Sequence, residues 1–209
     1  MSSRAMVTVF IAALLATAAS PSLARAAEAT AHSVLAHFGD EDALFLAIYE
    51  RVAGATTGFD ADEELRIAES VHQAALAEGV DPFLILAVIH VESSFKKGQR
   101  SSVGALGLMQ VKPSTAEAFA AAAGVRWRGA ATLFDVESNI RIGARYLAFK
   151  LQRFDDDEIL ALAAYCHGPT RVRRILRNEG GLDQDHQRYS RRVLRTYAYY
   201  RGAVGIPVG

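Results

Sequence analysis

Apolar residues recur along this chain mainly at the three- and four-residue spacing of a helix. Few stretches alternate apolar and polar residues with β-branched enrichment, whereas alanine, leucine, arginine and glutamate dominate the segments between glycine and proline breaks. The pattern therefore predicts an all-α fold. Helices are expected at about residues 41–52, 62–78, 82–95, 113–124, 136–154, 161–165, 172–178 and 187–201.

The helices carry recognisable start and stop signals. Gly79 ends the second expected helix, and Asp81 followed by Pro82 supplies an N-cap residue with proline at the first helical position. Asp135 is expected to cap the long helix that reaches Phe154. No repeat, heptad pattern or linker-like low-complexity segment follows residue 26. Residues 27–209 therefore read as one compact helical unit.

One helix places a carboxylate on an apolar face. Ile85, Val88 and Ile89 lie at positions i, i+3 and i+4 of that face, and Glu92 takes position i+7. Loss of solvation disfavours the charged carboxylate, which raises its pKa and lets it serve as a general acid near neutral pH. The alternative is a glutamate at a helix end that reaches water or an arginine.

The first residues have the pattern of a secretory signal peptide. Arg4 precedes an apolar run over residues 5–19, and Ala24-Arg25-Ala26 forms a small-x-small cleavage signature. The run is shorter than the roughly 20 residues of a membrane-spanning helix, although an uncleaved anchor is an alternative. We expect residues 1–26 to be a signal peptide and the remainder to be periplasmic or otherwise exported.

Charge and cysteine content narrow the function further. Removing Arg4 and Arg25 with the signal peptide leaves 21 basic against 23 acidic residues, which points to no nucleic acid partner. Arginines crowd the last third of the chain, where a solvated helix surface is favoured over a polyanion site. The single cysteine, Cys166, has no partner within the chain, so no internal disulfide is expected.

Short motifs in a fixed order carry a family resemblance. The segment HVESSFKKGQRSSVGALGLMQVKPSTAEAF places Glu92-Ser93 before Gly104-Ala105 and Gly107-Leu108-Met109-Gln110. Further matches follow in order: Leu133-Phe134-Asp135, Asn139-Ile140, Gly143, Tyr146-Leu147, Ala163-Ala164-Tyr165, Gly168-Pro169, Tyr189 and Val193-Leu194. Over about residues 80–200 the chain resembles the soluble lytic transglycosylase-like domain, within the lysozyme-like group. We expect an N-terminal helical extension over 27–78, packed on a catalytic domain at 79–209.

The resemblance implies an enzyme that cleaves the bond between N-acetylmuramic acid and N-acetylglucosamine in bacterial peptidoglycan. Glu92 would protonate the glycosidic oxygen and then, as a base, deprotonate the muramyl C6 hydroxyl, which leaves a 1,6-anhydromuramyl end. Ser101 would hydrogen-bond this carboxylate, Met109 and Gln110 would line the saccharide cleft, and Tyr165 would lie close to Glu92.

The chain departs from the family at two motifs. Cys166-His167 stands where the family usually has Asn-Ala, and because a thiol is a poorer hydrogen-bonding group than an amide, sugar positioning could differ. The late Glu-Thr-x-x-Tyr-Val signature appears with Asp185 as its carboxylate and Tyr189 as its tyrosine. Cys166 and Tyr189 remain candidate substrate-binding residues.

Other classes of function explain the residues less well. A hydrolytic muramidase would need a second carboxylate, for which Asp135, Glu137 and Asp185 are the candidates. A cysteine hydrolase would need a histidine better placed than the one adjacent to Cys166. A zinc deaminase motif cannot be built from one cysteine, and the sequence contains no His-Glu-x-x-His motif. No metal or cofactor is therefore predicted. The non-enzyme alternative is a peptidoglycan-binding or envelope-assembly module.

The resemblance also indicates partners. The expected partner is the peptidoglycan glycan strand, with an envelope or secretion-machine protein as a candidate protein partner. The chain itself is expected to act as a monomer.

Overall fold

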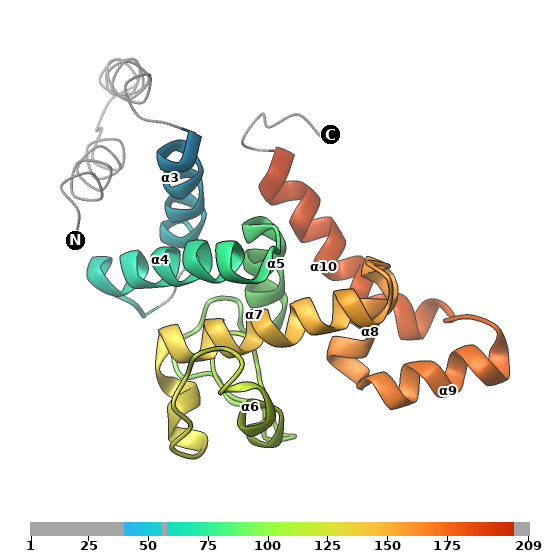
Figure 1. Ribbon diagram of the computed structural model, residues 1–209. Helices are drawn as coiled ribbons and strands as arrows, with labels where there is room; N and C mark the ends of the chain where they lie inside the picture. The colour runs from blue at the N-terminus through green and yellow to red at the C-terminus, as the bar shows by residue number, and fades with distance from the viewer. Residues whose placement is uncertain (1–39, 56–57, 203–209) are drawn as a thin grey trace.

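The computed structural model of the protein describes residues 40–55 and 58–202, and the regular elements of this part of the chain are helices joined by turns and loops (Figure 1). Its elements are α3 (Asp40–Ala53), α4 (Ala61–Glu78), α5 (Pro82–Ser93), α6 (Pro113–Phe119), the 3₁₀ helix η1 (Ala130–Phe134), α7 (Val136–Arg153), α8 (Glu158–His167), α9 (Pro169–Glu179) and α10 (Gln184–Gly202). Two isolated β-bridges, Arg100 with Leu106 and Leu106 with Val111, tie the loop between α5 and α6. The predicted all-α fold is confirmed.

The helix ends follow the local sequence signals. Asp60 and Glu63 form a capping box at the start of α4, and Gly79 ends that helix in the left-handed conformation at φ 64°. The Asp81 side chain accepts a hydrogen bond from the backbone N–H of Phe83, and Pro82 takes the first turn of α5. Asp135 caps α7 through the N–H of Ser138, as predicted.

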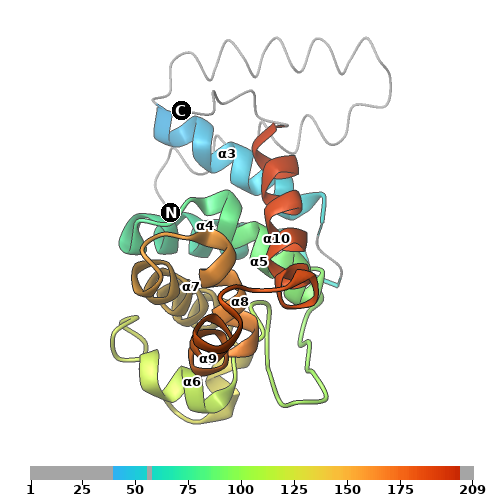
Figure 2. The same cartoon turned by 90° about the vertical axis from the view of Figure 1, so that its right-hand side faces the viewer.

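Helix α5 lies at the centre of the molecule and packs against α3, α4 and α10 (Figures 1 and 2). Every residue from Phe83 to Ile89 is buried, because neighbouring helices cover the helix on all sides. Ile85, Val88 and Ile89 are fully buried as the apolar stripe predicted, but the buried surface of α5 extends around the whole helix and not along one stripe alone. A helix so enclosed holds its last turn in a fixed place.

Several predicted helix boundaries were wrong, including those of α6 and α9. Helix α6 ends at Phe119 rather than at residue 124, and residues 120–124 continue as turns. Gly124, at φ 66°, closes them together with a hydrogen bond from the N–H of Val125 to the carbonyl of Ala120. Helix α9 begins at Pro169, which was expected to belong to a Gly168-Pro169 break ahead of the helix. Proline suits the first position of a helix, so the predicted start at Val172 missed the first turn of α9.

The buried side chains of α3, α4, α5, α7 and α10 belong to one hydrophobic core. A smaller cluster beneath α9 holds Phe154, Ala161, Ala163, Ala164 and Val172. The expected signal peptide at residues 1–26 lies outside the described residues, and the division at residue 78 stays a prediction. No helix in the described part of the chain is long and apolar enough to cross a membrane.

Candidate active site

A cleft of about 360 Å³ opens beside the last turn of α5. Its walls come from the loop that precedes α6, from the start of α6, from α7 and from the end of α8. The described residues that line it are Glu92, Ser101, Val103, Ala105, Gln110, Val111, Lys112, Thr115, Tyr146, Tyr165, Cys166, His167 and Gly168. Among them, Glu92 is the one residue with a carboxylate.

The Glu92 carboxylate is held by a residue from the far end of the chain. The hydroxyl of Tyr189 on α10 donates a hydrogen bond of 2.6 Å to Glu92 Oε1. Burial raises the pKa of Glu92, whereas the Tyr189 hydrogen bond and the positive charge of Arg192 act in the opposite direction. The side chain therefore combines a fixed position with a proton affinity above that of an exposed glutamate.

Two further tyrosines form the wall behind this carboxylate. The hydroxyl of Tyr165 donates to the backbone carbonyl of Met109 at 2.8 Å, and its ring packs against that of Tyr146 with centroids 5.1 Å apart. Burial, with the Glu92 charge as a smaller cause, raises the pKa of Tyr165 well above its usual range. Tyr165 therefore stays neutral and acts as a rigid part of the wall.

The loop before α6 is fixed from within the core by Asn139 of α7. The Asn139 amide donates to the carbonyls of Leu106 and Leu133, each at 3.0 Å, and its oxygen accepts from the N–H of Met109 at 2.8 Å. Gly107 leaves room for this amide, because a Cβ there would lie 2.1 Å from Asn139 Nδ2. Gly107 also has φ 77°, which glycine adopts without strain.

Gln110 joins this loop to the cleft. It lies at φ 47°, and its side-chain amide donates to the carbonyls of Gly107 at 2.8 Å and Gln99 at 3.2 Å. Both donors thus brace the loop. The side chain still lines the cleft, so its carbonyl oxygen is the group it has left for a ligand.

The structure brings together most of the site residues predicted from sequence. Ser101, Gln110, Tyr165 and Cys166 all line the cleft with Glu92. Cys166 is an exposed residue as a whole, but its thiol is partly desolvated by the surrounding protein, and this desolvation together with the Glu92 charge raises the pKa of the thiol.

Three expected roles are corrected by the geometry. The Met109 side chain is fully buried against Gly143 and does not line the cleft, because the loop turns it toward the core. Within the described residues, Ser101 makes no hydrogen bond to Glu92, and its hydroxyl oxygen accepts from the N–H of Ala105 at 3.0 Å. Tyr189 makes the carboxylate contact expected of Ser101, and it is buried rather than open to a sugar.

Sequence reasoning assigned no role to Asn139, Tyr146 or His167. The first two stood among the family motifs, and a polar Asn139 beside the apolar Ile140 within a helix was the signal for a buried structural amide. His167 lines the cleft and packs edge-on against His186 with ring centroids 6.0 Å apart. Burial, helped by nearby Arg171 and His186, lowers the pKa of His167, so it is mainly neutral near pH 7.

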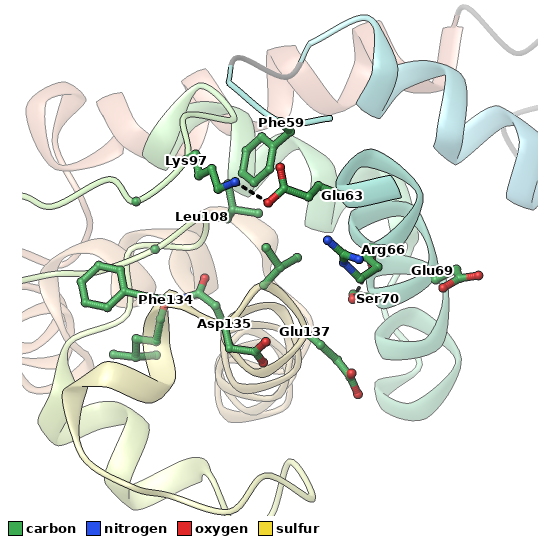
Figure 3. A pocket seen from close by; sticks show the side chains of 15 residues that line it. Phe59, Glu63, Arg66, Glu69, Ser70, Lys97, Leu108, Phe134, Asp135 and Glu137 are labelled. Carbon is green, nitrogen blue, oxygen red and sulfur yellow. Dashed lines mark hydrogen bonds and ion pairs between the residues drawn. The ribbon is translucent and has the colours of Figure 1, made fainter. Parts of the chain in front are cut away.

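The other candidate carboxylates lie elsewhere. Asp135 and Glu137 line a separate pocket between α4 and the start of α7 (Figure 3). Asp185 forms an exposed ion pair with Arg188 at 2.8 Å on α10. None of the three lines the cleft that holds Glu92.

Comparison with known proteins gives consistent matches. Residues 69–188 match the transglycosylase SLT domain family. A soluble lytic murein transglycosylase of Salmonella typhimurium is 36% identical over 132 residues, which cover 57% of this chain and 20% of the relative. Membrane-bound lytic murein transglycosylase F of Desulfosudis oleivorans is 32% identical over 193 residues, which cover 78% and 40%. This chain thus spans well under half the length of both relatives.

Solved structures show the same fold. An inactive mutant of the lytic transglycosylase Slt from Pseudomonas aeruginosa superposes with a TM-score of 0.61 at 27% identity, covering 98% of this chain and 36% of that one. The 70-kDa soluble lytic transglycosylase in complex with bulgecin A gives a TM-score of 0.61 at 29% identity, covering 78% and 28%. The predicted lysozyme-like helical architecture is confirmed.

Proposed function

The chain belongs to the transglycosylase SLT domain family, and we propose that it cleaves the glycan strands of peptidoglycan by lytic transglycosylation. One observation carries the proposal: a single partly buried glutamate, hydrogen-bonded by a buried tyrosine, is the one carboxylate among the described residues that line the cleft. The bond cleaved is the β-1,4 linkage between N-acetylmuramic acid and N-acetylglucosamine.

Glu92 acts first as the acid. Its burial favours the protonated form, so the carboxyl donates its proton to the glycosidic oxygen as the bond to the muramyl carbon breaks. The departing N-acetylglucosamine leaves with a new hydroxyl, and the muramyl ring is left with oxocarbenium character.

Glu92 then acts as the base. Its carboxylate removes the proton from the C6 hydroxyl of the same muramyl residue, and that oxygen bonds to the anomeric carbon to close a 1,6-anhydro ring. Because the nucleophile is part of the substrate, its effective concentration is high and no attacking water needs a second carboxylate. Hydrolytic glycosidases of the usual kind place two carboxylates across the bond, an arrangement that the described cleft residues do not provide.

The remaining cleft residues position the sugar. Gln110 offers its amide oxygen, Ser101 its hydroxyl, and Cys166 the thiol where the family's asparagine would stand. Tyr189 positions Glu92 rather than binding substrate. We propose that the protein is exported and acts on peptidoglycan in the periplasm or cell envelope, which the predicted signal peptide supports.

The test compares three purified proteins on peptidoglycan sacculi, with mass spectrometry of the soluble products. The original protein should release anhydromuramyl ends, and Glu92→Gln should lower release by about 10³-fold. Glu137→Gln makes the same chemical change on an exposed residue outside the cleft and should leave release unaltered. Reducing ends in place of anhydro ends would establish a hydrolytic muramidase, and no release by folded protein would leave a binding module.

A further inference from the structure

Helix α10 has a second face that the proposed reaction does not use. One face turns Tyr189, Val193 and Tyr200 into the core. The other borders a groove of about 660 Å³, lined among the described residues by Ile159, Gln184, Arg188, Arg191, Leu194, Arg195 and Ala198. It shares no described lining residue with the cleft around Glu92.

The rim of this groove is basic. Arg188, Arg191 and Arg195 follow one another at positions i, i+3 and i+7, so they project from one side of the helix. All three are exposed, and the groove has no carboxylate among its described lining residues. The side chains therefore form a row of positive charge along the groove.

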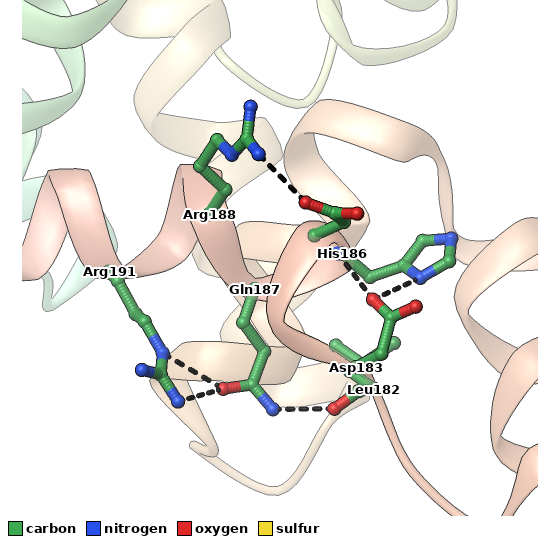
Figure 4. A network of polar contacts seen from close by, with 7 residues as sticks. Leu182, Asp183, His186, Gln187, Arg188 and Arg191 are labelled. Atoms are coloured by element: carbon green, nitrogen blue, oxygen red, sulfur yellow. Dashed lines mark hydrogen bonds and ion pairs between the residues drawn. The ribbon is translucent and has the colours of Figure 1, made fainter.

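Few direct ion pairs among the described residues offset this charge. Arg188 pairs with Asp185, but both side chains are more than 80% exposed, and so exposed a pair contributes little to stability. Arg191 donates through Nε and Nη2 to the neutral side-chain oxygen of Gln187 (Figure 4). Arg195 makes no hydrogen bond or ion pair within the described residues. Two of the three guanidinium groups thus face solvent with no anionic partner.

The floor of the groove is apolar. Ile159 of α8 and Leu194 of α10 are half-buried, and Ala198 continues the floor one turn beyond Leu194. From Gln184 to Ala198 the groove follows the helix for about 21 Å, at a rise of 1.5 Å per residue. A groove about four helical turns long, apolar below and basic along its rim, has the shape and charge to bind an amphipathic helix.

We propose that this α10 groove docks an acidic amphipathic helix of a partner protein. Apolar side chains at i, i+3, i+4 and i+7 of that helix would cover Leu194 and Ile159, and flanking glutamates or aspartates would pair with the three arginines. Docking there leaves the cleft open. The partner would contact α10, the helix whose Tyr189 donates the hydrogen bond that holds Glu92 in place.

The test uses a synthetic peptide of about 16 residues, long enough to follow the groove, with leucines at the stated helical spacing and glutamates on both flanks. Fluorescence anisotropy measures its binding to the full protein. A scrambled peptide of the same composition lacks the apolar face and reports charge alone. Binding of the patterned peptide, at least about tenfold tighter than of the scrambled one, is expected.

Variants then locate the site. Arg188→Glu/Arg191→Glu/Arg195→Glu should weaken binding of the patterned peptide by about a hundredfold or more. Arg171→Glu/Arg174→Glu/Arg177→Glu reverses three exposed arginines of α9, outside the groove, and should change binding less than about threefold. Circular dichroism would check that both variants are folded.

Equal binding of patterned and scrambled peptides, or equal losses in the two variants, would overturn the proposal in favour of a diffuse basic surface. Loss of sacculus binding in the α10 variant with no effect on the peptide would identify anionic glycan as the occupant and would also overturn it. Release of anhydromuramyl products is measured in parallel. Because the groove and the cleft are separate, failure of the docking site and failure of the catalytic proposal are distinguishable.

Discussion

Replacing Tyr189 by phenylalanine removes one oxygen from the site and keeps the ring that packs in the core. The lost hydroxyl donates at 2.6 Å to Glu92 Oε1, and this bond lowers the pKa of a carboxyl that burial otherwise raises. Tyr189→Phe should therefore raise the pKa of Glu92 further. Because a general acid works while protonated, the alkaline limb of the pH–rate profile should move to higher pH.

The cost to stability should depend on pH in a defined direction. A hydrogen bond to a charged group contributes about 1.5–3 kcal/mol, and one between neutral groups about 0.5–1.5 kcal/mol. Since the folded pKa of Glu92 lies above its unfolded value, its proton-linked contribution favours the folded state at low pH and is lost as pH rises through the folded pKa. Tyr189→Phe should thus lower the free energy of unfolding by about 1 kcal/mol at pH 4 and by about 2 kcal/mol at pH 8.

Urea denaturation at the two pH values and the pH dependence of product release measure both effects. Tyr197→Phe is the matched control, because Tyr197 lies on the same helix and donates at 2.8 Å to a carboxylate outside the cleft, Asp81 Oδ2. It should lower stability without moving the pH–rate profile. If the alkaline limb stayed in place or moved to lower pH in Tyr189→Phe, the assignment of Tyr189 as the residue that tunes Glu92 would be wrong.

Three other changes test the scaffold and the cleft. Asn139→Ala leaves three buried backbone groups without their partner, so the free energy of unfolding should fall by about 3 kcal/mol in urea titrations. A loss below about 1 kcal/mol would show that the loop before α6 does not depend on the Asn139 amide. Burial lowers the pKa of Lys150 to about 8, so Lys150→Met should be more stable than the original protein at pH 7. The variant should lose this advantage as pH rises from about 8 to 10.5. A stability difference that thermal unfolding shows to be constant over this pH range would contradict the prediction. A bulky maleimide on Cys166 should block product release, and labelling should become faster as pH rises because the thiol pKa is raised. Cys166→Ser should be unaffected by the reagent. Full activity of the labelled protein would place Cys166 outside the glycan path.

The sequence was enough to predict what depends on neighbours one or two turns apart. The capping aspartates at 81 and 135, the glycine at 79 and the helical spacing of apolar residues determine most of the helices, because these effects act within about four residues. The same local reasoning placed Glu92 at the end of an apolar helix. Motif order then indicated the family.

Only the tertiary structure decided which side chains meet Glu92. Tyr189 lies 97 residues further along the chain, and the packing of α10 on α5 brings its hydroxyl to the carboxylate in place of Ser101. Met109 belongs to the core rather than the cleft because Asn139, 30 residues away, holds its backbone from inside. Periodicity along the sequence cannot encode such contacts, because they arise only when the buried faces of separate helices pack together. That packing determines which polar groups come within hydrogen-bonding distance.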